Sequence, residues 1–533
     1  MTAHTQFSHL PVAEQNRHVI AHLTPELWSK ANRLHVRKAI AEFAHERLFT
    51  PECVSQPTSA DEMADYQLAA PQDEVIYHFR ARRLALEHWA IDADSIQKTQ
   101  NGVEQELDSL RFIIEFKDVL GIPQEMLPTY MEEITSTLYS SAFKHLREGV
   151  LIEHLLEADF QTLEGAMMEG HPAFVANNGR IGFDAFDYQA YAPEAAAPIN
   201  FVWLAAHKSK AHFASIDELS YQQLLEEELT PSIVDGFTQQ LIAQDLDPNN
   251  YIFMPVHPWQ WQNKLTGIFA PDIAKRELVY LGIGDDNYQA QQSIRTFFNT
   301  SHPRKRYVKT ALSILNMGFM RGLSPYYMAT TPGINEWLAE LIENDSCLRD
   351  YGFRMLREVA TIGYRNHYYE SAVSGDTPYK KMMAALWRES PLALIQSNQR
   401  VMTMAALLHQ DRDGNALLPA MIQASGLETG EWLKRYLQSY LSPLLHCLYT
   451  YDLAFMPHGE NLILVLENHT PVHVFMKDIA EEIVVMDPDA DLPEKAKRVA
   501  VFVPDELKIL SIFTDVFDGF FRFMAAILHE QGN

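Results

Sequence analysis

A window of unusually basic sequence is the first place in this chain where chemistry is expected. The 533 residues carry 70 acidic and 43 basic side chains, a formal net charge of −27, yet residues 287–335 contain no Asp or Glu. The cations of this window are Arg295, Arg304, Lys305, Arg306, Lys309 and Arg321. Polyanions such as nucleoside triphosphates need several cations and hydroxyl donors, and Ser293-Ile294-Arg295-Thr296 offers a guanidinium between two hydroxyls. The window therefore predicts a phosphate-binding surface.

The cations of this window are not equivalent. The run 304–306 follows a proline, and because such runs are usually exposed, we expect it mainly to pair with acidic surface residues. Lys309 and Arg321 lie instead within the apolar segments YVKTALSIL and MGFMRGL, where burial without an anionic partner is costly. For these two residues we expect a functional role.

The segment HGENLILVLENHTPVHVFMKD indicates a second candidate site, built on strand, turn and strand. A four-residue turn at 468–471 would place Asn461 opposite Asp478, with Cα atoms about 4.5–5.5 Å apart. An amide oxygen and a carboxylate next to His458 and Glu460 predict a Mg²⁺ site, because Mg²⁺ prefers oxygen ligands and usually keeps bound phosphate. The structural alternative makes Asn461 a turn or cap residue and Asp478 the N-cap of IAEEIV.

Two further histidines are candidates of lower specificity. Gly170-His171-Pro172 precedes an Asn- and Gly-rich loop that ends at Arg180 and could cradle phosphate or form a rigid turn. His257 follows the apolar run YIFMPV and precedes Pro and Trp, a context typical of a packed core corner.

The elements that must position these residues follow from the apolar periodicity. Apolar positions at intervals of three and four from residue 25 predict a helical N-terminal domain, 1–150. Short β-type runs such as INFVWLAAH and ELVYLGIG predict an α/β domain with a mixed sheet over 151–335. Helical periodicity returns over 336–533, around the one hairpin, so we expect an α+β fold with a mainly helical C-terminal domain.

Composition narrows the class of protein. The acidic balance argues against a nucleic-acid binder or a protein adsorbed to an anionic membrane. Cys53, Cys347 and Cys447 lie far apart in the sequence and lack the spacing of a zinc site or a disulfide framework. The polar N-terminus and the absence of a long apolar run predict a cytoplasmic protein.

Taken together, these segments resemble the IucA/IucC family of NRPS-independent siderophore (NIS) synthetases, in order and spacing from about residue 20 onward. The matching pieces are EGHP with Arg180, MPVHPWQ, SIRT, Lys309 of YVKTALSI followed twelve residues later by Arg321, HGEN, and Asp478 of MKDIAEE. The run LTPELWSKANRLHVRKAIAEFAHERL is similar to the branch that makes desferrioxamine, bisucaberin, putrebactin and alcaligin.

The resemblance implies a three-domain, hand-like architecture of thumb, fingers and palm, with a distantly kinase-like palm, a homodimer, and ATP between fingers and palm. The nucleotide's phosphates would be held by Ser293, Arg295, Thr296 and Lys309 with His171 nearby, and Mg²⁺ by Asn461 and Asp478. The carboxylate being activated would face Arg321, His458 and Arg180, which makes Lys309, Arg321 and His458 the candidate catalytic residues.

One departure from the family pattern bears on the substrate. Many citrate-using members read GHPxHPxxKxRxG, whereas Phe174, Val175 and Asn178 stand here in place of the second His, the Pro and the Lys. The loss of two potential cations fits a less charged acid, such as the succinyl monoamide end of an N-hydroxy-N-succinyl diamine. The implied reaction is adenylation of that carboxylate and condensation with an amine to oligomers or a macrocycle, with release of AMP and pyrophosphate.

Two other classes of function compete with this interpretation. A kinase-like phosphotransferase would release ADP, but the chain has neither a GxGxxG loop nor GxxxxGK[ST]. A non-catalytic binding protein for an anionic metabolite would keep the basic window without needing the metal site. Within the synthetase interpretation, putrescine- and cadaverine-derived substrates differ by one methylene, worth only about 1 kcal/mol, which the sequence does not resolve.

Overall fold

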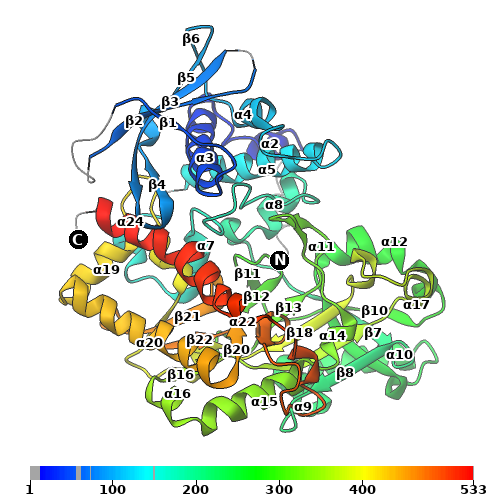
Figure 1. The fold of residues 1–533 in the computed structure, drawn as a ribbon. Helices are drawn as coiled ribbons and strands as arrows, with labels where there is room; N and C mark the ends of the chain where they lie inside the picture. Colours follow the sequence, from blue (N-terminus) through cyan, green and yellow to red (C-terminus); the bar gives the residue numbers. More distant parts are fainter. Residues whose placement is uncertain (1–11, 56–61, 73, 148–149, 532–533) are drawn as a thin grey trace.

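The computed structural model describes residues 12–55, 62–72, 74–147 and 150–531 (Figure 1). Their buried apolar side chains form three large hydrophobic cores. The first core draws on residues 31–138 together with Val175 and Ala176. The second extends from Ala190 to Trp387, and the third combines residues 150–168 with residues 334–528. We call the parts built on these cores the N-terminal, central and C-terminal units.

The N-terminal unit packs helices against an antiparallel sheet. Its main helices are α3 (Pro25–His45), α4 (Ser109–Phe116) and α5 (Leu127–Leu146). Its strands are β1 (Glu52–Cys53), β2 (Ala64–Ala69), β3 (Val75–Leu84), β4 (His88–Ile91), β5 (Gln97–Gln100) and β6 (Val103–Gln105). The strand order is β1-β2-β3-β5-β6, with β4 also paired to β3.

The prediction of a helical N-terminal domain is therefore wrong for residues 52–105. In β2, Ala64, Tyr66 and Leu68 are buried while the residues between them are more exposed, and β3 alternates in the same way. That period of two buries one face of a sheet, whereas the helical interval of three and four holds only for the flanking segments.

The central unit carries two antiparallel sheets. A small sheet has the order β10-β7-β9, from Leu278–Ile283, Val202–His207 and Tyr251–Val256. The larger one has the order β11-β12-β13-β18-β17-β8, from Tyr288–Ala290, Thr296–Asn299, Tyr307–Thr310, Ala384–Arg388, Glu358–Tyr364 and Ala211–Ser215. The predicted mixed sheet is thus wrong for this unit as described, because every strand pair of these two sheets is antiparallel.

The C-terminal unit combines long helices with a four-stranded mixed sheet. Its helices include α7 (Phe160–Ala166), α15 (Thr331–Asn344), α19 (Leu417–Ser425), α20 (Thr429–Tyr451) and α24 (Arg522–Glu530). Its sheet has the order β16-β22-β21-β19, from Phe353–Met355, Thr470–Met476, Leu462–Glu467 and Arg400–Thr403, with β16 parallel to β22. The α+β fold is confirmed.

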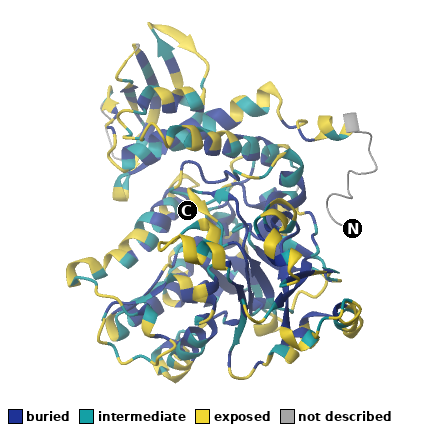
Figure 2. Ribbon diagram, turned by 90° about the vertical axis from the view of Figure 1, so that its right-hand side faces the viewer, coloured by how far each residue is buried: buried dark blue, intermediate teal, exposed yellow. Residues whose placement is uncertain are grey.

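The three cores do not follow chain order strictly. Residues 150–168 pack in the C-terminal unit, while β17 and β18 complete the central sheet although they follow α15. The domain boundaries at 150 and 335 stay a prediction. In the central unit most strands are almost wholly buried, except β8 and β10, and over the whole molecule exposed residues gather mainly on helices and turns (Figure 2).

The predicted hairpin exists, but its register differs by one residue. Strands β21 and β22 pair from Leu462–Met476 to Glu467–Thr470, so the turn is the two residues Asn468 and His469. Both have positive φ, 46° and 60°, as in the tight turns that match strand twist. The four-residue turn is therefore wrong, and the N–H of Lys477, not of Asp478, faces Asn461 and donates to its carbonyl oxygen at 3.0 Å.

Among the described helices, none is both long enough and apolar enough to cross a membrane.

Candidate active site

Lys309 and Asp478 form a buried ion pair between the central and C-terminal units. Lys309 lies on β13, where it pairs with Thr296 on β12, and Asp478 follows β22. The Lys309 Nζ to Asp478 Oδ1 distance is 2.6 Å, and Glu481 Oε2 lies 3.4 Å from the same Nζ. Lys309 is 4% and Asp478 8% exposed. The expectation that a lysine embedded in an apolar strand has an anionic partner is confirmed.

Asp478 does not act as a helix cap. It precedes the short helix α21 (Ile479–Glu482), yet its side chain accepts no capping hydrogen bond, and its φ of 57° is in the left-handed region. Its second oxygen lies 3.3 Å from Arg388 Nη1 and 3.7 Å from Lys477 Nζ. The structural alternative of an N-cap is therefore wrong, and the strained backbone aims the carboxylate at three cations.

The charges of this cluster shift one another's pKa values. Burial alone would raise the pKa of Asp478, but the cations of Lys309, Arg388 and Lys477 outweigh it and hold the pKa well below its usual range. For Lys309 burial acts to lower the pKa, but the carboxylates of Asp478, Glu481 and Glu358 together outweigh it, so the pKa is raised. Both groups are thus charged at neutral pH, which keeps a fixed cation in a water-poor site.

The segment from Ser293 to Arg295 supplies further donors. The Ser293 hydroxyl is buried without a hydrogen-bond partner in the structure. Ile294 has a φ of 55°, a rare conformation for a β-branched residue. Arg295 donates to the Gly322 carbonyl and lies 3.6 Å from Glu481. Strain and an unused buried donor together are typical of a ligand-binding loop.

Arg321 and Arg295 face a common region. Arg321 donates through Nε and Nη2 to Asn316 Oδ1, at 3.1 and 2.6 Å. Burial, and then the charge of Arg295, lower the pKa of Arg321 to about 10. The structure thus holds Arg321 by an uncharged amide, which leaves its charge available to an anion.

Two of the three candidate histidines, His171 and His458, meet edge to face. The rings of His171 and His458 have centroids 5.5 Å apart. Burial lowers the pKa of both, to about 4 for His171, so both are neutral at pH 7. His458 Nδ1 accepts a hydrogen bond from the Glu460 N–H at 3.3 Å. The loop 170–172 and the HGEN turn, far apart in the chain, are therefore neighbours.

Asn461 lies beside Glu482, a carboxylate whose charged form is disfavoured by its surroundings. Its Nδ2 donates to the Met456 carbonyl at 3.0 Å and to Glu482. Burial, and then the charge of Asp478, raise the pKa of Glu482 to about 7. Glu358, whose pKa is also raised by burial, accepts from the Ala480 N–H at 3.2 Å. Oxygen donors are thus concentrated around the predicted metal ligands, in the chemistry that a hard divalent cation prefers.

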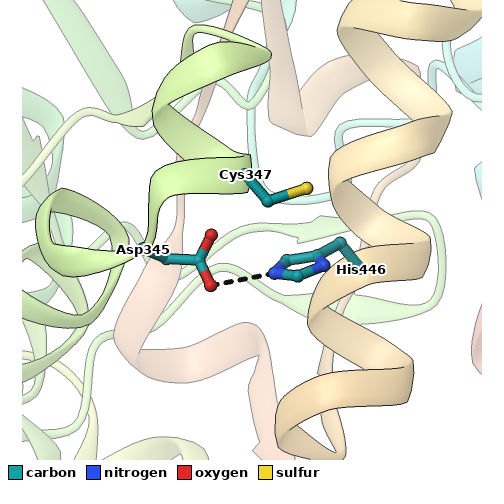
Figure 3. Close-up of side chains that lie close together, drawn as sticks. All are labelled: Asp345, Cys347 and His446. Atoms are coloured by element: carbon teal, nitrogen blue, oxygen red, sulfur yellow. Dashed lines mark hydrogen bonds and ion pairs between the residues drawn. The ribbon is translucent and has the colours of Figure 1, made fainter.

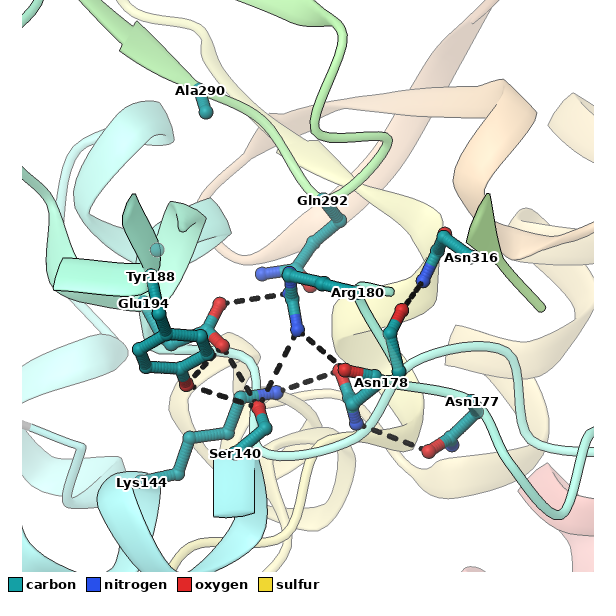
Figure 4. A network of polar contacts seen from close by, with 12 residues as sticks. Ser140, Lys144, Asn177, Asn178, Arg180, Tyr188, Glu194, Ala290, Gln292 and Asn316 are labelled. Carbon is teal, nitrogen blue, oxygen red and sulfur yellow. Dashed lines mark hydrogen bonds and ion pairs between the residues drawn. The ribbon is translucent and has the colours of Figure 1, made fainter. Parts of the chain in front are cut away.

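Arg180 lies in a different network (Figure 4). Its guanidinium pairs with Glu194 at 2.9 Å and donates to the Asn178 carbonyl at 2.7 Å, and Tyr188 donates to the same Glu194. The Lys144 ammonium donates to Asn178 Oδ1 at 3.0 Å. None of these contacts involves another predicted site residue, so the structure does not bring Arg180 into direct contact with the Lys309 cluster.

The remaining sequence expectations have clear outcomes. Lys305 pairs with Asp286 at 2.8 Å and Arg306 with Glu227 at 2.6 Å, which confirms pairing with acidic residues for these two members of the run, while Arg304 is exposed and forms no ion pair with the described residues. His257 is fully buried and its Nδ1 accepts from the Trp259 N–H at 3.1 Å, which confirms the core corner. All three cysteines are free.

Arg388 is the main site residue that sequence reasoning missed. It is 1% exposed, contacts Asp478, and lies over the Tyr307 ring at 5.4 Å. It ends the apolar strand segment AALWR, so the criterion applied to Lys309, a cation embedded in apolar sequence, would have found it. Glu481 and Glu482 were missed because acidic residues after Asp478 look like an ordinary helix start.

A second group of ligand-type side chains lies away from this cluster. Asp345, Cys347 and His446 have donor atoms within 4.8 Å of one another (Figure 3). Both oxygens of Asp345 are already used, one by the Leu348 N–H and the other by His446 Nε2 and the Tyr451 hydroxyl. These bonds cap a short helix and fix it to α20, which is sufficient to explain the group.

Comparison with known proteins gives relatives along the whole chain. A family model described as IucA / IucC family matches residues 159–409, and one described as ferric iron reductase FhuF-like transporter matches residues 430–533. Putrebactin synthase of Shewanella sp. (strain MR-4) is 50% identical over 519 residues, 97% of this chain and 82% of that protein. The rhizobactin siderophore biosynthesis protein RhbF of Rhizobium meliloti (strain 1021) is 31% identical, over 95% of this chain and 84% of that protein.

Solved structures show the same fold. Aerobactin synthetase IucC of Klebsiella pneumoniae superimposes with a TM-score of 0.84 at 27% identity, over 95% of this chain and 89% of that chain. The petrobactin biosynthesis protein AsbB of Bacillus anthracis superimposes with a TM-score of 0.86 at 24% identity, over 96% of this chain and 86% of that chain.

The fold and the relatives define the class first: synthases and ligases of siderophore biosynthesis, and therefore enzymes. Within that class, the chain belongs to the IucA/IucC family of NIS synthetases.

Proposed function

We propose that this enzyme adenylates a carboxylate with ATP and condenses it with an amine, releasing AMP and pyrophosphate. The observation that carries the proposal is the buried Lys309–Asp478 pair, because it joins the central and C-terminal units where fixed cations and carboxylates converge. A phosphate chain needs the cations, and the metal that accompanies it needs the carboxylates. One structural neighbour, at 17% identity, is an ATP-bound aerobactin synthetase IucA, which supports the fold's capacity for the nucleotide.

In the first step, an oxygen of the substrate carboxylate would attack the α-phosphorus of ATP, and the bond to the β-phosphate oxygen would break. Lys309, Arg295 and the hydroxyls of Ser293 and Thr296 would hold the phosphates, with His171 at their edge. Arg321, which has no acidic side chain in ion-pair contact within the described chain, would orient the incoming carboxylate. Fixed cations stabilise charge that develops at phosphorus without reorganising during the reaction.

The residues present fit a bound Mg²⁺. Asn461 keeps its amide oxygen as an acceptor because its Nδ2 makes both of its side-chain hydrogen bonds, and Asp478 lies one residue beyond the position that faces it. The raised pKa of Glu482 marks an excess of buried negative charge that a cation would relieve. When bound, Mg²⁺ would neutralise phosphate charge; Asn461 and Asp478 are its proposed ligands.

In the second step, the amine nitrogen would attack the acyl carbon and AMP would leave with the carbon–oxygen bond electrons. An amine that enters as an ammonium loses two protons on the way to the amide. His458 is the proposed first acceptor, since its lowered pKa leaves it neutral and its Nδ1 already accepts the Glu460 N–H.

The proposed substrate is an N-hydroxy-N-succinyl diamine. One support is the 50% identity to putrebactin synthase. The other is that Phe174, Val175 and Asn178 stand in place of the second His, the Pro and the Lys of the motif found in many citrate-using members. Asn178 accepts from Lys144, and Phe174 packs edge to face against His171 at 5.1 Å, so neither supplies a charge for a tricarboxylate. In this proposal Arg180 also contacts substrate, although in the structure it is paired with Glu194.

We further propose that the three cores correspond to the thumb, fingers and palm of a hand-like molecule, with a distantly kinase-like palm, that acts as a cytoplasmic homodimer. Light scattering of the purified chain measures the oligomeric state directly.

The test of the reaction is product identity. The purified protein is incubated with ATP, Mg²⁺ and N-hydroxy-N-succinyl-putrescine or its cadaverine homologue, and nucleotides and organic products are followed by mass spectrometry. AMP with amide-linked oligomers or rings is the expected result. ADP with a phosphorylated acceptor would support the kinase-like alternative instead, and binding without turnover would support a metabolite-binding protein.

A further inference from the structure

A cavity lies where the N-terminal unit meets the other two. It offers about 210 Å³ of space to a ligand. Its walls come from α3, β4, the segment 164–172, the short turn Gly459–Asn461 (η8) and the C-terminal helix α24. Because His171 and Glu460 line it, the cavity adjoins the proposed reaction site.

Three of the charged side chains that line this cavity are paired within the protein, namely Lys38, Glu42 and Glu169. Glu42 pairs with Arg522 of α24 at 2.6 Å. Glu169 pairs with Lys38 of α3 at 3.1 Å and also accepts from Asn177. These pairs fasten the N-terminal unit to the rest of the molecule, so they need no ligand.

Three other carboxylates that line the cavity, Glu164, Glu460 and the exposed Glu530, form no ion pair with the described residues, and the first two lie nearest the proposed reaction site. Glu164, on α7, is 5% exposed; one oxygen accepts from the Gln292 N–H at 3.2 Å, and the other is buried without a partner. For the Glu460 carboxylate, no hydrogen bond or ion pair is formed by any of the residues that the structure describes. A buried acceptor left unpaired costs free energy, so such groups are expected to meet a ligand.

The ligand chemistry follows from the charges and the walls. A primary ammonium carries three N–H donors and the positive charge that two carboxylates lack. Beside them the cavity is lined by apolar side chains that suit an alkyl chain, namely Trp89, Ile91, Phe520, Phe523 and Ile527. Lys309, Arg388 and Lys477 thus converge on Asp478, while Glu164 and Glu460, which form no ion pair with described residues, line the adjoining cavity together with Arg37 and Lys38.

We infer that Glu164 and Glu460 bind the primary ammonium group of the amine substrate, with its alkyl chain along the apolar wall next to α24. The inference rests on the proposed function, since it assigns the second reactant of that condensation. It also explains why the amine would arrive beside His458: Glu460 follows it by two residues, and their hydrogen bond fixes the turn.

The experiment separates amine binding from carboxylate activation. Glu460→Gln and Glu164→Gln are compared with wild type in amide formation at varied amine concentration, and in trapping of the activated acyl group by hydroxylamine, which is uncharged at pH 7.5. We expect KM for the amine to rise on the order of tenfold to a hundredfold, as for a lost charge-assisted hydrogen bond, while hydroxylamine trapping stays within twofold. Glu104→Gln, an exposed position on β6, is the matched control.

Three outcomes would overturn the inference. An unchanged KM for the amine removes any role for these carboxylates in its binding. An equal loss of hydroxylamine trapping means that they act in activation instead. If wild type forms neither AMP nor a trapped product, the proposed function itself fails. Thermal melting checks that each variant is folded, and the half-buried Glu460 carries the test if Glu164→Gln does not fold.

Discussion

Lys309 and Asp478 are separated by 169 residues in the chain and by 2.6 Å in space, and each is a charge that burial alone would disfavour. Removing one partner of a buried pair leaves the other uncompensated, which typically costs about 3–5 kcal/mol, whereas removing both can cost far less. Stability and activity should therefore respond differently to single and double substitutions.

We predict that Lys309→Met lowers activity at least about 100-fold and also lowers the melting temperature. Adding Asp478→Asn should restore part of the stability, because the buried carboxylate that lost its nearest cation is gone, but none of the activity; Arg388 and Lys477 lose their partner in that variant, so the recovery is incomplete. Melting curves and product assays of the four proteins in this double-mutant cycle make the comparison. Strictly additive losses of stability would contradict the coupling.

At the scale of elements, helix α3 is tied to the C-terminal segment by charge. His45 Nε2 lies 2.7 Å from Asp518, and this hydrogen bond outweighs the opposing effect of burial and raises the pKa of His45. Arg522, in the same region, pairs with Glu42 of α3. The contact between the N-terminal unit and the C-terminal segment thus contains a histidine whose protonated form is favoured by its partner.

We predict that His45→Gln lowers the melting temperature more at pH 5.5 than at pH 9. Because the folded-state pKa of His45 is raised, its stabilising contribution is complete below the unfolded value near 6.5 and is lost as pH rises through the folded value. The difference is expected on the order of 1 °C for a half-buried pair in a chain of this size. His207→Gln, on an exposed strand end, is the control; an equal effect at both pH values would exclude the charge as the cause.

At the scale of the molecule, three cores enclose a site that no single core forms. Thr296 and Lys309 come from the central unit, Asp478 and Asn461 from the C-terminal unit, and the cavity beside them is closed by α3 and β4 of the N-terminal unit. A ligand held between units binds the native arrangement and not the unfolded chain, so it stabilises the whole molecule.

We predict that ATP with Mg²⁺ at about 100 times its Kd raises the stability of the native state by about 2.7 kcal/mol, visible as a higher melting temperature. Lys309→Met should lose this increase, while Glu104→Gln should keep it. Differential scanning fluorimetry with ATP alone, Mg²⁺ alone and both makes the measurement. An unchanged shift in the Lys309 variant would remove that residue from the nucleotide site.

The sequence by itself determined which charged groups had to be paired and which histidine had to pack in the core. The pairing of Lys309 in YVKTALSIL, the burial of His257 after YIFMPV and the pairing of Lys305 and Arg306 all follow from local context. The cost of burying a charge or an imidazole does not depend on where in the chain its partner lies. The sheet of residues 52–105 also has a local sequence signal, because buried and more exposed residues alternate along β2 and β3. The helical periodicity of the flanking segments led to a helical prediction for this region.

Only the tertiary structure decided which groups meet. The hairpin register depended on a two-residue turn and a bulge opposite Val465 and Leu466, which shift the facing residue from Asp478 to Lys477. The approach of Arg388 to Asp478, and the cavity that leaves Glu164 and Glu460 unpaired, depend on how three separate cores pack together. Sequence spacing carries no record of that packing, because the contacts join segments far apart in the chain, by 90 residues for Arg388 and Asp478.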